Sequence, residues 1–319
     1  MSLGKRINPF SKVNNDTGFG NKADSFGGRF INKDGSYNIK KTGIPFTKRM
    51  SVYQTMLDMP RGVFIITILF FFLVVNVLYT LIYLLFGLDS FQGFIATTNW
   101  GKMKELFFFS TETFTTVGYG RINPIGDGAN LMAAIEALSG FLSFAIATGL
   151  MYGRFSKARA HIQFSEHAVI APYRGGTGLM FRLASYKNKH ALSDVTIQVN
   201  AGLLLSENGS EPTYKFYELP LERSRVETLM MNWTVVHPID ESSPFYGFSS
   251  EDMHTADLEI YVTIRGFDNI YSNTVLKRTS YTHKEIVFNA KFVQMYHESE
   301  DGKTTIFELD KLGQYTPAD

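Results

Sequence analysis

A stretch without any charged side chain, from Gly62 to Gly87, constrains the fold of this chain more than any other feature. As a helix it would rise roughly 37 Å at 1.5 Å per residue, enough to cross the apolar core of a bilayer. A segment in lipid must pair its own backbone N–H and C=O groups, and a helix does so within one segment. The stretch therefore predicts a membrane-spanning helix.

A second apolar run, from Ala129 to Tyr152, is interrupted by Glu136 and contains several small residues, Gly140 and Gly149 among them. Small residues allow helices to pack closely, and a carboxyl group at membrane depth is expected to face protein or water rather than lipid. This pattern is typical of an inner helix that lines a pore, with Glu136 and Gly149 on it.

Basic residues flank the two runs on their outer sides. By the positive-inside rule this distribution places both termini in the cytoplasm. Residues 1–43 lack the apolar core of a signal peptide, which agrees with that orientation. The flanking residues are Lys40, Lys41, Lys48, Arg49 and Arg61 before the first run, and Arg154, Lys157 and Arg159 after the second.

The segment before the first run, residues 44–60, places Met50, Tyr53 and Met56 at helical spacing. An amphipathic helix of this kind, with basic residues beside it, is predicted to lie along the inner leaflet of the membrane. An ordinary amphipathic connector is the alternative. Pro60 separates the segment from the span and marks a bend.

Between the two runs, residues 101–115 form an aromatic-rich stretch that is too short to cross a bilayer, and residues 116–120 follow it directly. We expect a re-entrant pore helix over 101–115 and a loop after it. Irregular backbone at membrane depth is tolerated only where protein or water surrounds it, so this arrangement requires several chains to close around the loop.

The loop reads Thr116-Val117-Gly118-Tyr119-Gly120, the sequence of the carbonyl-lined filter of potassium channels. Four copies around an axis would replace the water around K⁺ with backbone carbonyl oxygens. Gly118 and Gly120 lack a Cβ and can take dihedrals that point successive carbonyls to one side. Thr116 would add a hydroxyl at the inner mouth, while Val117 and Tyr119 would turn outward and brace the filter.

From residue 156 onward the sequence changes to short segments of alternating hydrophobicity, clearest from Leu258 to Arg265. Many such strands without a long helix between them predict an antiparallel β-sandwich over residues 156–319. A short helix is expected at Ser249–Asp252 from its capping-box pattern. The glycines of Gly175–Gly178 are interpreted as a turn between strands.

No enzyme chemistry is indicated by this half of the chain. There is no cysteine, and the seven histidines include no HExxH or paired metal-ligand spacing. A phosphate loop and a nucleophile elbow are also missing from the sequence. His237, Asp240 and Glu241 could form a metal or acid–base cluster, but a turn around Ser242-Ser243-Pro244 is favoured.

Several separated segments, in the same order along the chain, resemble those of the inward-rectifier potassium channels, in particular their prokaryotic branch. The resemblance implies an immunoglobulin-like fold for the cytoplasmic sandwich and a homotetramer whose conduction path continues through it. The matching segments are Arg29–Ile39, Glu112–Gly120, Phe164–Ala171, His237–Tyr246 and Arg278–Tyr281.

The resemblance also implies roles for residues of the pore. Tyr152 falls where the family keeps a bulky gate residue at the inner-helix crossing, and an interfacial aromatic is the alternative. Glu112 and Thr115 would support the filter, while Arg121 would either pair with Glu112 or alter the potential at the outer mouth. Phe144 stands where strong rectifiers carry a pore-facing acid.

Two further groups of residues come from the same resemblance. A loop that narrows the cytoplasmic pore would run from Gly266 to Ser272 and include Phe267, Ile270 and Tyr271. Anionic lipid would bind basic residues near the membrane, whose alternative role is orientation by the positive-inside rule. These basic residues are Lys48, Arg49, Arg61, Arg154, Lys157 and Arg159.

The sequence therefore favours a passive, homotetrameric, K⁺-selective channel of the inward-rectifier type in a bacterial inner membrane, gated through anionic phospholipid and its cytoplasmic domains. No cofactor beyond the conducted K⁺ and no nucleic acid is expected. A weakly selective cation channel and a membrane-anchored sensor with a vestigial filter are the alternatives. The expected parts are an N-terminal segment (1–43), in which the resemblance of Arg29–Ile39 implies a short strand, an interfacial helix (44–60), a pore domain (61–155) and a cytoplasmic sandwich (156–319).

Overall fold

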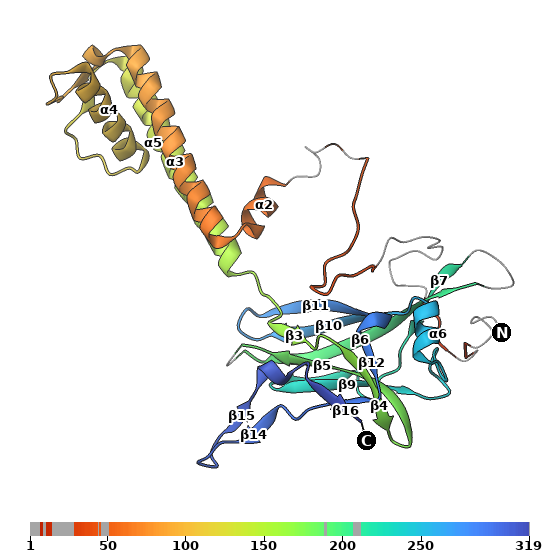
Figure 1. The fold of residues 1–319 in the computed structure, drawn as a ribbon. Helices are drawn as coiled ribbons and strands as arrows, with labels where there is room; N and C mark the ends of the chain where they lie inside the picture. The colour runs from red at the N-terminus through yellow and green to blue at the C-terminus, as the bar shows by residue number, and fades with distance from the viewer. Residues whose placement is uncertain are drawn as a thin grey trace. The chain divides into compact units, whose positions relative to one another are not determined.

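A computed structural model describes residues 7–8, 11–14, 29–43, 45, 51–187, 190–206 and 212–318. The chain divides into two compact units (Figure 1). The membrane unit comprises residues 42–157, and the soluble unit comprises residues 158–319 together with the N-terminal segment that ends at Lys41. Each unit has its own buried apolar core.

The membrane unit is built from helices. Ser51 caps the first of them by accepting a hydrogen bond from Gln54 N at 3.3 Å, and Pro60 precedes the second. Leu88–Ser90 form a short 3₁₀ turn, η2, and a two-residue ribbon pairs β1 (Phe91–Gln92) with β2 (Asn123–Pro124). The helices are α2 (Val52–Asp58), α3 (Arg61–Phe86), α4 (Asn99–Phe114) and α5 (Asp127–Phe155).

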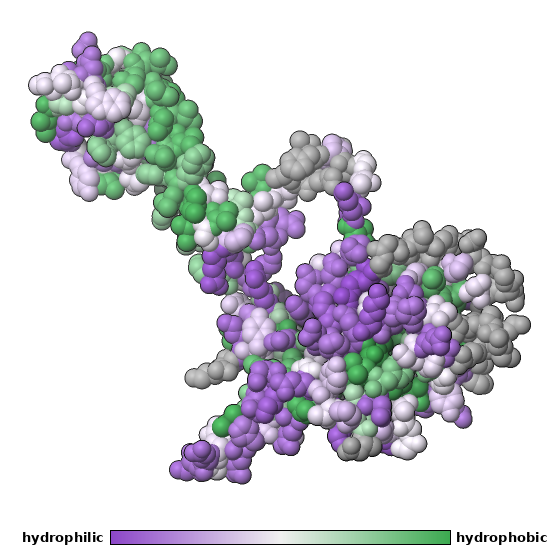
Figure 2. Space-filling view, viewed as in Figure 1, coloured by the Kyte–Doolittle hydropathy of each residue, from purple (hydrophilic) through white to green (hydrophobic). Residues whose placement is uncertain are grey.

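Helices α3 and α5 are both long and apolar enough to span a membrane. Only 11% of the most apolar stretch of each is buried within the chain, so their hydrophobic surfaces are left for lipid or for other subunits. Figure 2 shows this apolar surface along the helical unit. Two spans with a shorter helix between them confirm the predicted membrane architecture.

Close approach of α5 to the end of α4 depends on Gly140. A Cβ at this position would lie 1.9 Å from the carbonyl oxygen of Phe114, the last residue of α4. No larger side chain fits there, which explains a glycine inside a membrane helix. Around this contact, Tyr83, Leu106 and Phe109 belong to a buried cluster that joins α3, α4 and α5.

The soluble unit contains two five-stranded sheets. One has the order β11-β10-β6-β7, with β8 also paired to β6, and the other has the order β12-β4-β5-β3, with β9 also paired to β5. Their strands are β3 (Ile162–Phe164), β4 (Ala168–Tyr173), β5 (Gly176–Ser185), β6 (Leu192–Leu205), β7 (Thr213–Glu218), β8 (Arg225–Leu229), β9 (Asn232–Ile239), β10 (Glu259–Asp268), β11 (Asn273–Thr282) and β12 (Ile286–Phe288).

Small elements complete the unit. Two ribbons pair β13 with β16 and β14 with β15. The helix α6 begins after Ser249, whose hydroxyl and the Asp252 carboxylate form the predicted capping box. The remaining elements are α6 (Ser250–Thr255), η3 (His283–Glu285), β13 (Ala290–Phe292), β14 (Tyr296–Glu298), β15 (Thr305–Phe307), η4 (Leu309–Lys311) and β16 (Tyr315–Pro317).

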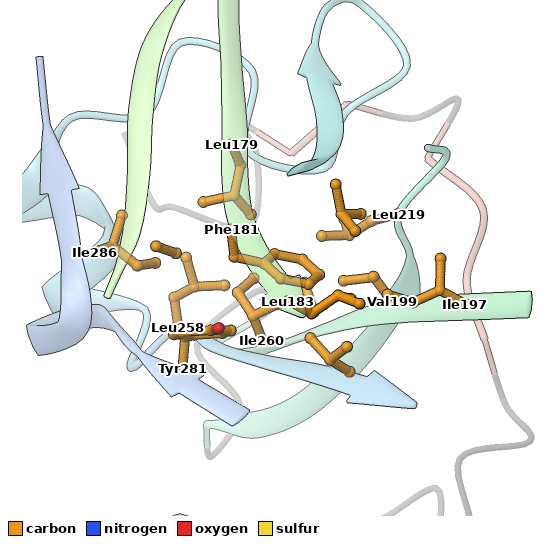
Figure 3. Close-up of a cluster of buried hydrophobic side chains, with 14 of the residues drawn as sticks. Leu179, Phe181, Leu183, Ile197, Val199, Leu219, Leu258, Ile260, Tyr281 and Ile286 are labelled. Carbon is orange, nitrogen blue, oxygen red and sulfur yellow. The ribbon is translucent and has the colours of Figure 1, made fainter. Parts of the chain in front are cut away.

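The core of the soluble unit lies between the two sheets. Figure 3 shows Phe181 and Leu183 of β5 beside Val199 of β6 and Ile260 of β10, all buried in one cluster. The period-two alternation of these strands places every second side chain in that core. The predicted sandwich is confirmed, with one difference: β12 pairs with β4 in parallel, whereas we expected antiparallel strands throughout.

Two turns agree with their predictions. Arg174 and Gly175 have positive φ values of 48° and 82° and form the hairpin turn between β4 and β5, whereas Gly176 and Gly178 of the predicted turn belong to β5. His237 Nδ1 donates to the carbonyl oxygen of Pro220 at 2.6 Å, and its Nε2 lies 2.9 Å from Ser243 Oγ. The Asp240 carboxylate accepts from Ser242 N at 2.8 Å, which forms the expected turn.

Residues 29–38 form an N-terminal clip on the outer face of β10 and β11. Phe30 packs edge-on against the rings of Tyr214 and Tyr261, with ring centroids 5.3 Å and 6.0 Å away, and its backbone N–H donates to Glu259 Oε2 at 3.1 Å. Thr279 Oγ1 donates to the carbonyl of Lys33 at 3.0 Å. The clip contains a single β-bridge, Ile31 to Tyr37, where the sequence predicted a short strand.

Candidate conduction pathway

The filter residues follow directly after α4, and their backbone departs from helical geometry at every second residue. Thr116, Gly118 and Gly120 have φ values of 60°, 56° and 79°, so every second residue is left-handed. The carbonyl of Glu112 accepts from Val117 N at 2.9 Å and from Gly118 N at 3.3 Å. In a strand, successive carbonyls point to opposite sides; alternation of the sign of φ is what allows them to face one way.

The two filter glycines are selected by backbone conformation rather than by crowding. A Cβ on Gly118 or Gly120 would meet no atom within 4 Å, so only the left-handed dihedrals disfavour a larger residue. Thr116 adopts the same conformation at a cost of ~1–2 kcal/mol for an L-residue. Val117 and Tyr119 are 53% and 79% exposed in the single chain, so the described residues leave most of the surface of these two side chains, which are expected to brace the filter, uncovered.

The residues expected to support the filter have different partners from those predicted. Arg121 Nη1 lies 3.2 Å from Glu105 Oε1, so it pairs with Glu105 and not with Glu112. Glu105 also accepts from Ile95 N at 3.1 Å, which places it beneath the loop that precedes α4. The Glu112 side chain is half-buried, and no described residue pairs with it. Thr115 Oγ1 donates to the carbonyl of Thr111 at 2.7 Å.

Glu136 is not on an open surface. Its side chain is fully buried between α3, α4 and α5, where Tyr83 donates to Oε2 and Ser110 Oγ lies 2.5 Å from Oε1. The expectation that Glu136 lines the pore is therefore corrected. The carboxyl group lies behind the pore helix, because hydroxyl groups on α3 and α4 meet it there.

The face of α5 that carries Phe144, Gly149 and Tyr152 is open. Phe144 and Tyr152 are each 74% exposed, and a Cβ on Gly149 would meet nothing within 4 Å. An apolar groove of about 830 Å³ runs beside this face, lined by residues of α2, α3 and α5 and by Thr115 and Thr116 at the base of the filter. The predicted pore-lining positions other than Glu136 thus share an accessible face of α5.

Two of the six expected lipid-binding residues are engaged within the membrane unit. Arg154 donates to the carbonyl groups of Met56, Leu57 and Met59 at the C-terminal end of α2, at 3.1 Å for Leu57 and 2.6 Å for Met59. Its guanidinium carbon also lies 4.4 Å from the centroid of the Phe64 ring. The last carbonyls of a helix have no partner within it, so a cation there is favourable.

The other five of these basic residues differ in their surroundings. Lys157 Nζ lies 2.5 Å from Asp58 Oδ1, a second link between α5 and α2. Arg61 and Arg159 are exposed and pair with none of the described residues. Lys48 and Arg49 lie outside the described residues. Free cationic side chains near the ends of the spans are therefore Arg61 and Arg159 in the part of the chain that the structure describes.

The expected cytoplasmic loop is shorter than predicted. Gly266 and Phe267 belong to β10, next to a bulge in its pairing with β6, and the connection to β11 contains only residues 269–272. Asp268, which is fully buried, accepts from Ile270 N at 2.9 Å and from Tyr271 N at 3.3 Å. Ile270 remains 63% exposed. Ser272 has a φ of 47° and closes the turn.

A histidine holds this loop from the neighbouring segment. His190 Nε2 lies 2.8 Å from Asp268 Oδ2, and the His161 ring stands edge-on to it with centroids 4.9 Å apart. Burial lowers the pKa of His161 below its ordinary value, and the neighbouring His190 acts in the same direction. The loop is thus fixed by a buried His–Asp contact at its base.

The similarity of this chain to known proteins identifies its family. A family profile described as the inward rectifier potassium channel C-terminal domain matches residues 162–314, and one described as an ion channel matches residues 63–157. The inward rectifier potassium channel Kirbac3.1 of Paramagnetospirillum magnetotacticum is 34% identical over 281 residues, which are 87% of this chain and 92% of that protein. The chain belongs to the inward rectifier potassium channel family.

Vertebrate members of the inward rectifier family are similar at lower identity. The ATP-sensitive inward rectifier potassium channel 12 of Gallus gallus is 25% identical, covering 93% of this chain and 77% of that protein. The G protein-activated inward rectifier potassium channel 2 of Mus musculus is 26% identical, covering 88% and 70%. The family consists of ion channels, so this inward rectifier is a membrane transport protein and not an enzyme.

Sequence reasoning missed several residues of the pathway in this inward rectifier. Glu105 was not singled out, although it is a carboxylate on the helix before the filter and its charge is opposite to that of Arg121. Asp268 and His190 are 78 residues apart in sequence, and no local pattern connects them. The carbonyl partners of Arg154 are backbone atoms, which leave no signal in the amino-acid sequence.

Proposed function

We propose that this inward rectifier forms a homotetramer that conducts K⁺ selectively through the backbone carbonyls of Thr116–Gly120. The observation that carries the proposal is the alternating left-handed backbone at Thr116, Gly118 and Gly120, directly after the pore helix. Dehydrated K⁺ needs a ring of carbonyl oxygens, and one chain supplies only a single column of them. The exposed side chains of Val117 and Tyr119 support packing of the filter against other subunits.

Ion flux in liposomes tests this proposal. The purified full-length protein should pass K⁺ much faster than Na⁺, and its mass in detergent should be that of four chains. Equal permeation of K⁺ and Na⁺ would favour the weakly selective cation channel instead. A tetramer without flux in any lipid mixture would favour the sensor with a vestigial filter.

The proposed parts of the channel are an N-terminal segment (1–43), an interfacial helix (44–60), a pore domain (61–155) and a cytoplasmic domain (156–319). Both termini lie in the cytoplasm of the cell, which is supported by the excess of Lys and Arg outside the two spans. Residues 269–272, with the exposed Ile270, narrow the path through the cytoplasmic domains.

Tyr152 is the proposed gate, since it is 74% exposed on the open face of α5 near the helix end. Four such rings around an axis would narrow the inner mouth, and a smaller side chain should widen it. We expect Tyr152→Ala to raise K⁺ flux in liposomes severalfold at unchanged K⁺/Na⁺ selectivity. Phe155→Ala, three residues further along α5 and also exposed, serves as the comparison. Unchanged flux in Tyr152→Ala would leave this residue the role of an interfacial aromatic.

Anionic lipid is proposed to act through Arg61 and Arg159, the exposed basic residues without a partner in the described chain. Each basic residue near a charged membrane surface is worth about 1 kcal/mol. We therefore expect the double variant Arg61→Gln and Arg159→Gln to need roughly thirtyfold more anionic lipid for the same change in K⁺ flux, which corresponds to ~2 kcal/mol. Lys303→Gln, at the exposed β14–β15 turn, controls for the loss of a positive charge elsewhere on the chain. An unaltered lipid response would restrict both arginines to orienting the chain.

A further inference from the structure

A chain of buried polar side chains joins the three helices of the membrane unit behind the filter. It consists of Asn76 and Tyr83 of α3, Ser110 of α4 and Glu136 of α5, and all four are fully buried. Tyr83 donates to Glu136 Oε2, Ser110 Oγ lies 2.5 Å from Glu136 Oε1, and the same Ser110 Oγ lies 3.2 Å from Asn76 Oδ1. We refer to these four residues as the buried polar chain.

The orientation of the Asn76 amide is settled by its own helix. Asn76 Nδ2 lies 2.7 Å from the carbonyl oxygen of Phe72, and a carbonyl can only accept, so the NH₂ group must face it. The amide oxygen Oδ1 therefore faces Ser110. Ser110 Oγ lies 3.2 Å from both Oδ1 and the backbone carbonyl oxygen of Asn76. The backbone carbonyl already accepts from Thr80 Oγ1 at 2.7 Å, so Oδ1 is the acceptor for which the described residues provide no donor other than Ser110.

The number of protons available for hydrogen bonds in the buried polar chain distinguishes the carboxylate form of Glu136 from the carboxylic acid form. If Glu136 is a carboxylate, Tyr83 donates to Oε2, and Ser110 donates its single hydroxyl proton to Oε1. No donor among the described residues then remains for Asn76 Oδ1. If Glu136 is a carboxylic acid, its own O–H donates to Ser110 Oγ, and Ser110 donates to Asn76 Oδ1. Only the acid form provides a donor for Asn76 Oδ1 within the buried polar chain.

Electrostatics favours the same form. A carboxylate at membrane depth needs a compensating cation, and no Lys, Arg or His of the described chain pairs with Glu136. The titratable groups facing it are the phenols of Tyr83 and Tyr79 on α3, the second of which is bonded to Ser139 at 2.9 Å. Helix α4 presents Ser110, and its acidic residues Glu105 and Glu112 make no hydrogen bond to Glu136.

We propose that Glu136 is a proton-binding site, held as a neutral acid whose O–H completes the hydrogen-bond chain Glu136–Ser110–Asn76 and thereby positions α4 behind the filter. The role of this proton is structural. It allows Ser110 to donate to Asn76 Oδ1, which otherwise has no hydrogen-bond donor among the described residues. Glu136 is a positioning residue, since it touches the pore helix and not the conducted ion. The consequence for selectivity rests on the proposed function of residues 116–120; the protonation itself does not.

Infrared spectroscopy of the full-length protein in lipid at neutral pH tests the protonation without reference to conduction. We expect a carboxylic-acid C=O band in the wild type that disappears in Glu136→Gln. Ser110→Ala, which removes the acceptor of the acid proton, should shift this band to higher frequency, and it provides a second assignment where Glu136→Gln does not assemble. An acid band that responds to neither variant, or no acid band at all, overturns the proposal.

Flux measurements then test the positioning role. In Glu136→Gln the amide N–H replaces the acid O–H and the amide oxygen still accepts from Tyr83, so K⁺/Na⁺ selectivity should stay within about twofold of the wild type. Glu136→Ala should lower it by roughly tenfold, which corresponds to ~1.4 kcal/mol. Loss in Glu136→Gln equal to that in Glu136→Ala would show that the charge is needed and overturn the proposal. A wild type without K⁺ flux but with the assigned acid band would instead refute the proposed channel function alone.

Discussion

Replacing Gly118 by Ala is expected to abolish selective K⁺ conduction, with the K⁺/Na⁺ permeability ratio falling at least tenfold. Gly118 has a φ of 56°, and an L-residue pays ~1–2 kcal/mol for this conformation in each chain. The proposed filter contains four copies, so the penalties combine and favour a different arrangement of the carbonyls. Reversal potentials under mixed K⁺ and Na⁺ gradients in liposomes measure the ratio directly.

Gly175 provides a matched control for this substitution. It has a φ of 82°, a Cβ would meet nothing within 4 Å at either position, and it lies in the β4–β5 turn of the soluble unit. Gly175→Ala should therefore carry a similar backbone penalty and leave selectivity unchanged. A Gly118→Ala protein with wild-type selectivity would contradict the filter assignment and favour a sensor whose activity does not depend on conduction.

Replacing Arg154 by Met is expected to detach the end of α2 from α5. The substitution keeps the apolar stem but removes the donors that reach the carbonyls of Met56, Leu57 and Met59. Hydrogen bonds to a charged donor are worth about 1.5–3 kcal/mol each, and their effects overlap, so we expect a loss of roughly 3 kcal/mol. Hydrogen exchange of the α2 amides should accelerate by more than tenfold.

Arg61→Met is the control for this experiment, because Arg61 is exposed at the start of α3 and pairs with no described residue. It removes the same charge from the same region and should leave α2 exchange unchanged. If Arg154→Met instead altered only the response to anionic lipid, with α2 exchange as in the wild type, the lipid-binding role first expected for Arg154 would be correct.

The fold of this inward rectifier was predictable where one local property dominates. The charge-free run before Gly87 leaves no alternative to a spanning helix, and the Ser249–Asp252 pattern determines a helix start through contacts three residues apart. Strand alternation predicts which side chains are buried but does not give the direction of pairing. The parallel pairing of β12 with β4 therefore could not be read from the sequence.

The site was predictable for backbone chemistry and less so for side-chain pairing. The filter glycines specify their dihedrals by residue type, and the structure has them at positive φ. Two acidic residues of the preceding helix, Glu105 and Glu112, could have formed an ion pair with Arg121. Which one does so depends on the path of the loop before α4, whose Ile95 N–H donates to Glu105. Glu136 was predicted to avoid lipid, but its sequence position does not tell whether its side chain faces water or protein. That depends on the rotation of α5 about its own axis. The hydroxyl groups of Tyr83 and Ser110 favour the observed rotation because they hydrogen-bond to the carboxyl group.

The N-terminal clip has a mechanical consequence for the whole chain. Residues 29–38 are fastened to β10 and β11, the following residues lead to α2, and α5 leads back to β3 of the same soluble unit. The soluble unit is therefore connected to the membrane unit by two chain segments. Because Arg154 ties α2 to α5, these two segments enter the membrane unit at helices that are hydrogen-bonded to each other. A substitution that removes the Arg154 contact therefore also separates the two connections from each other.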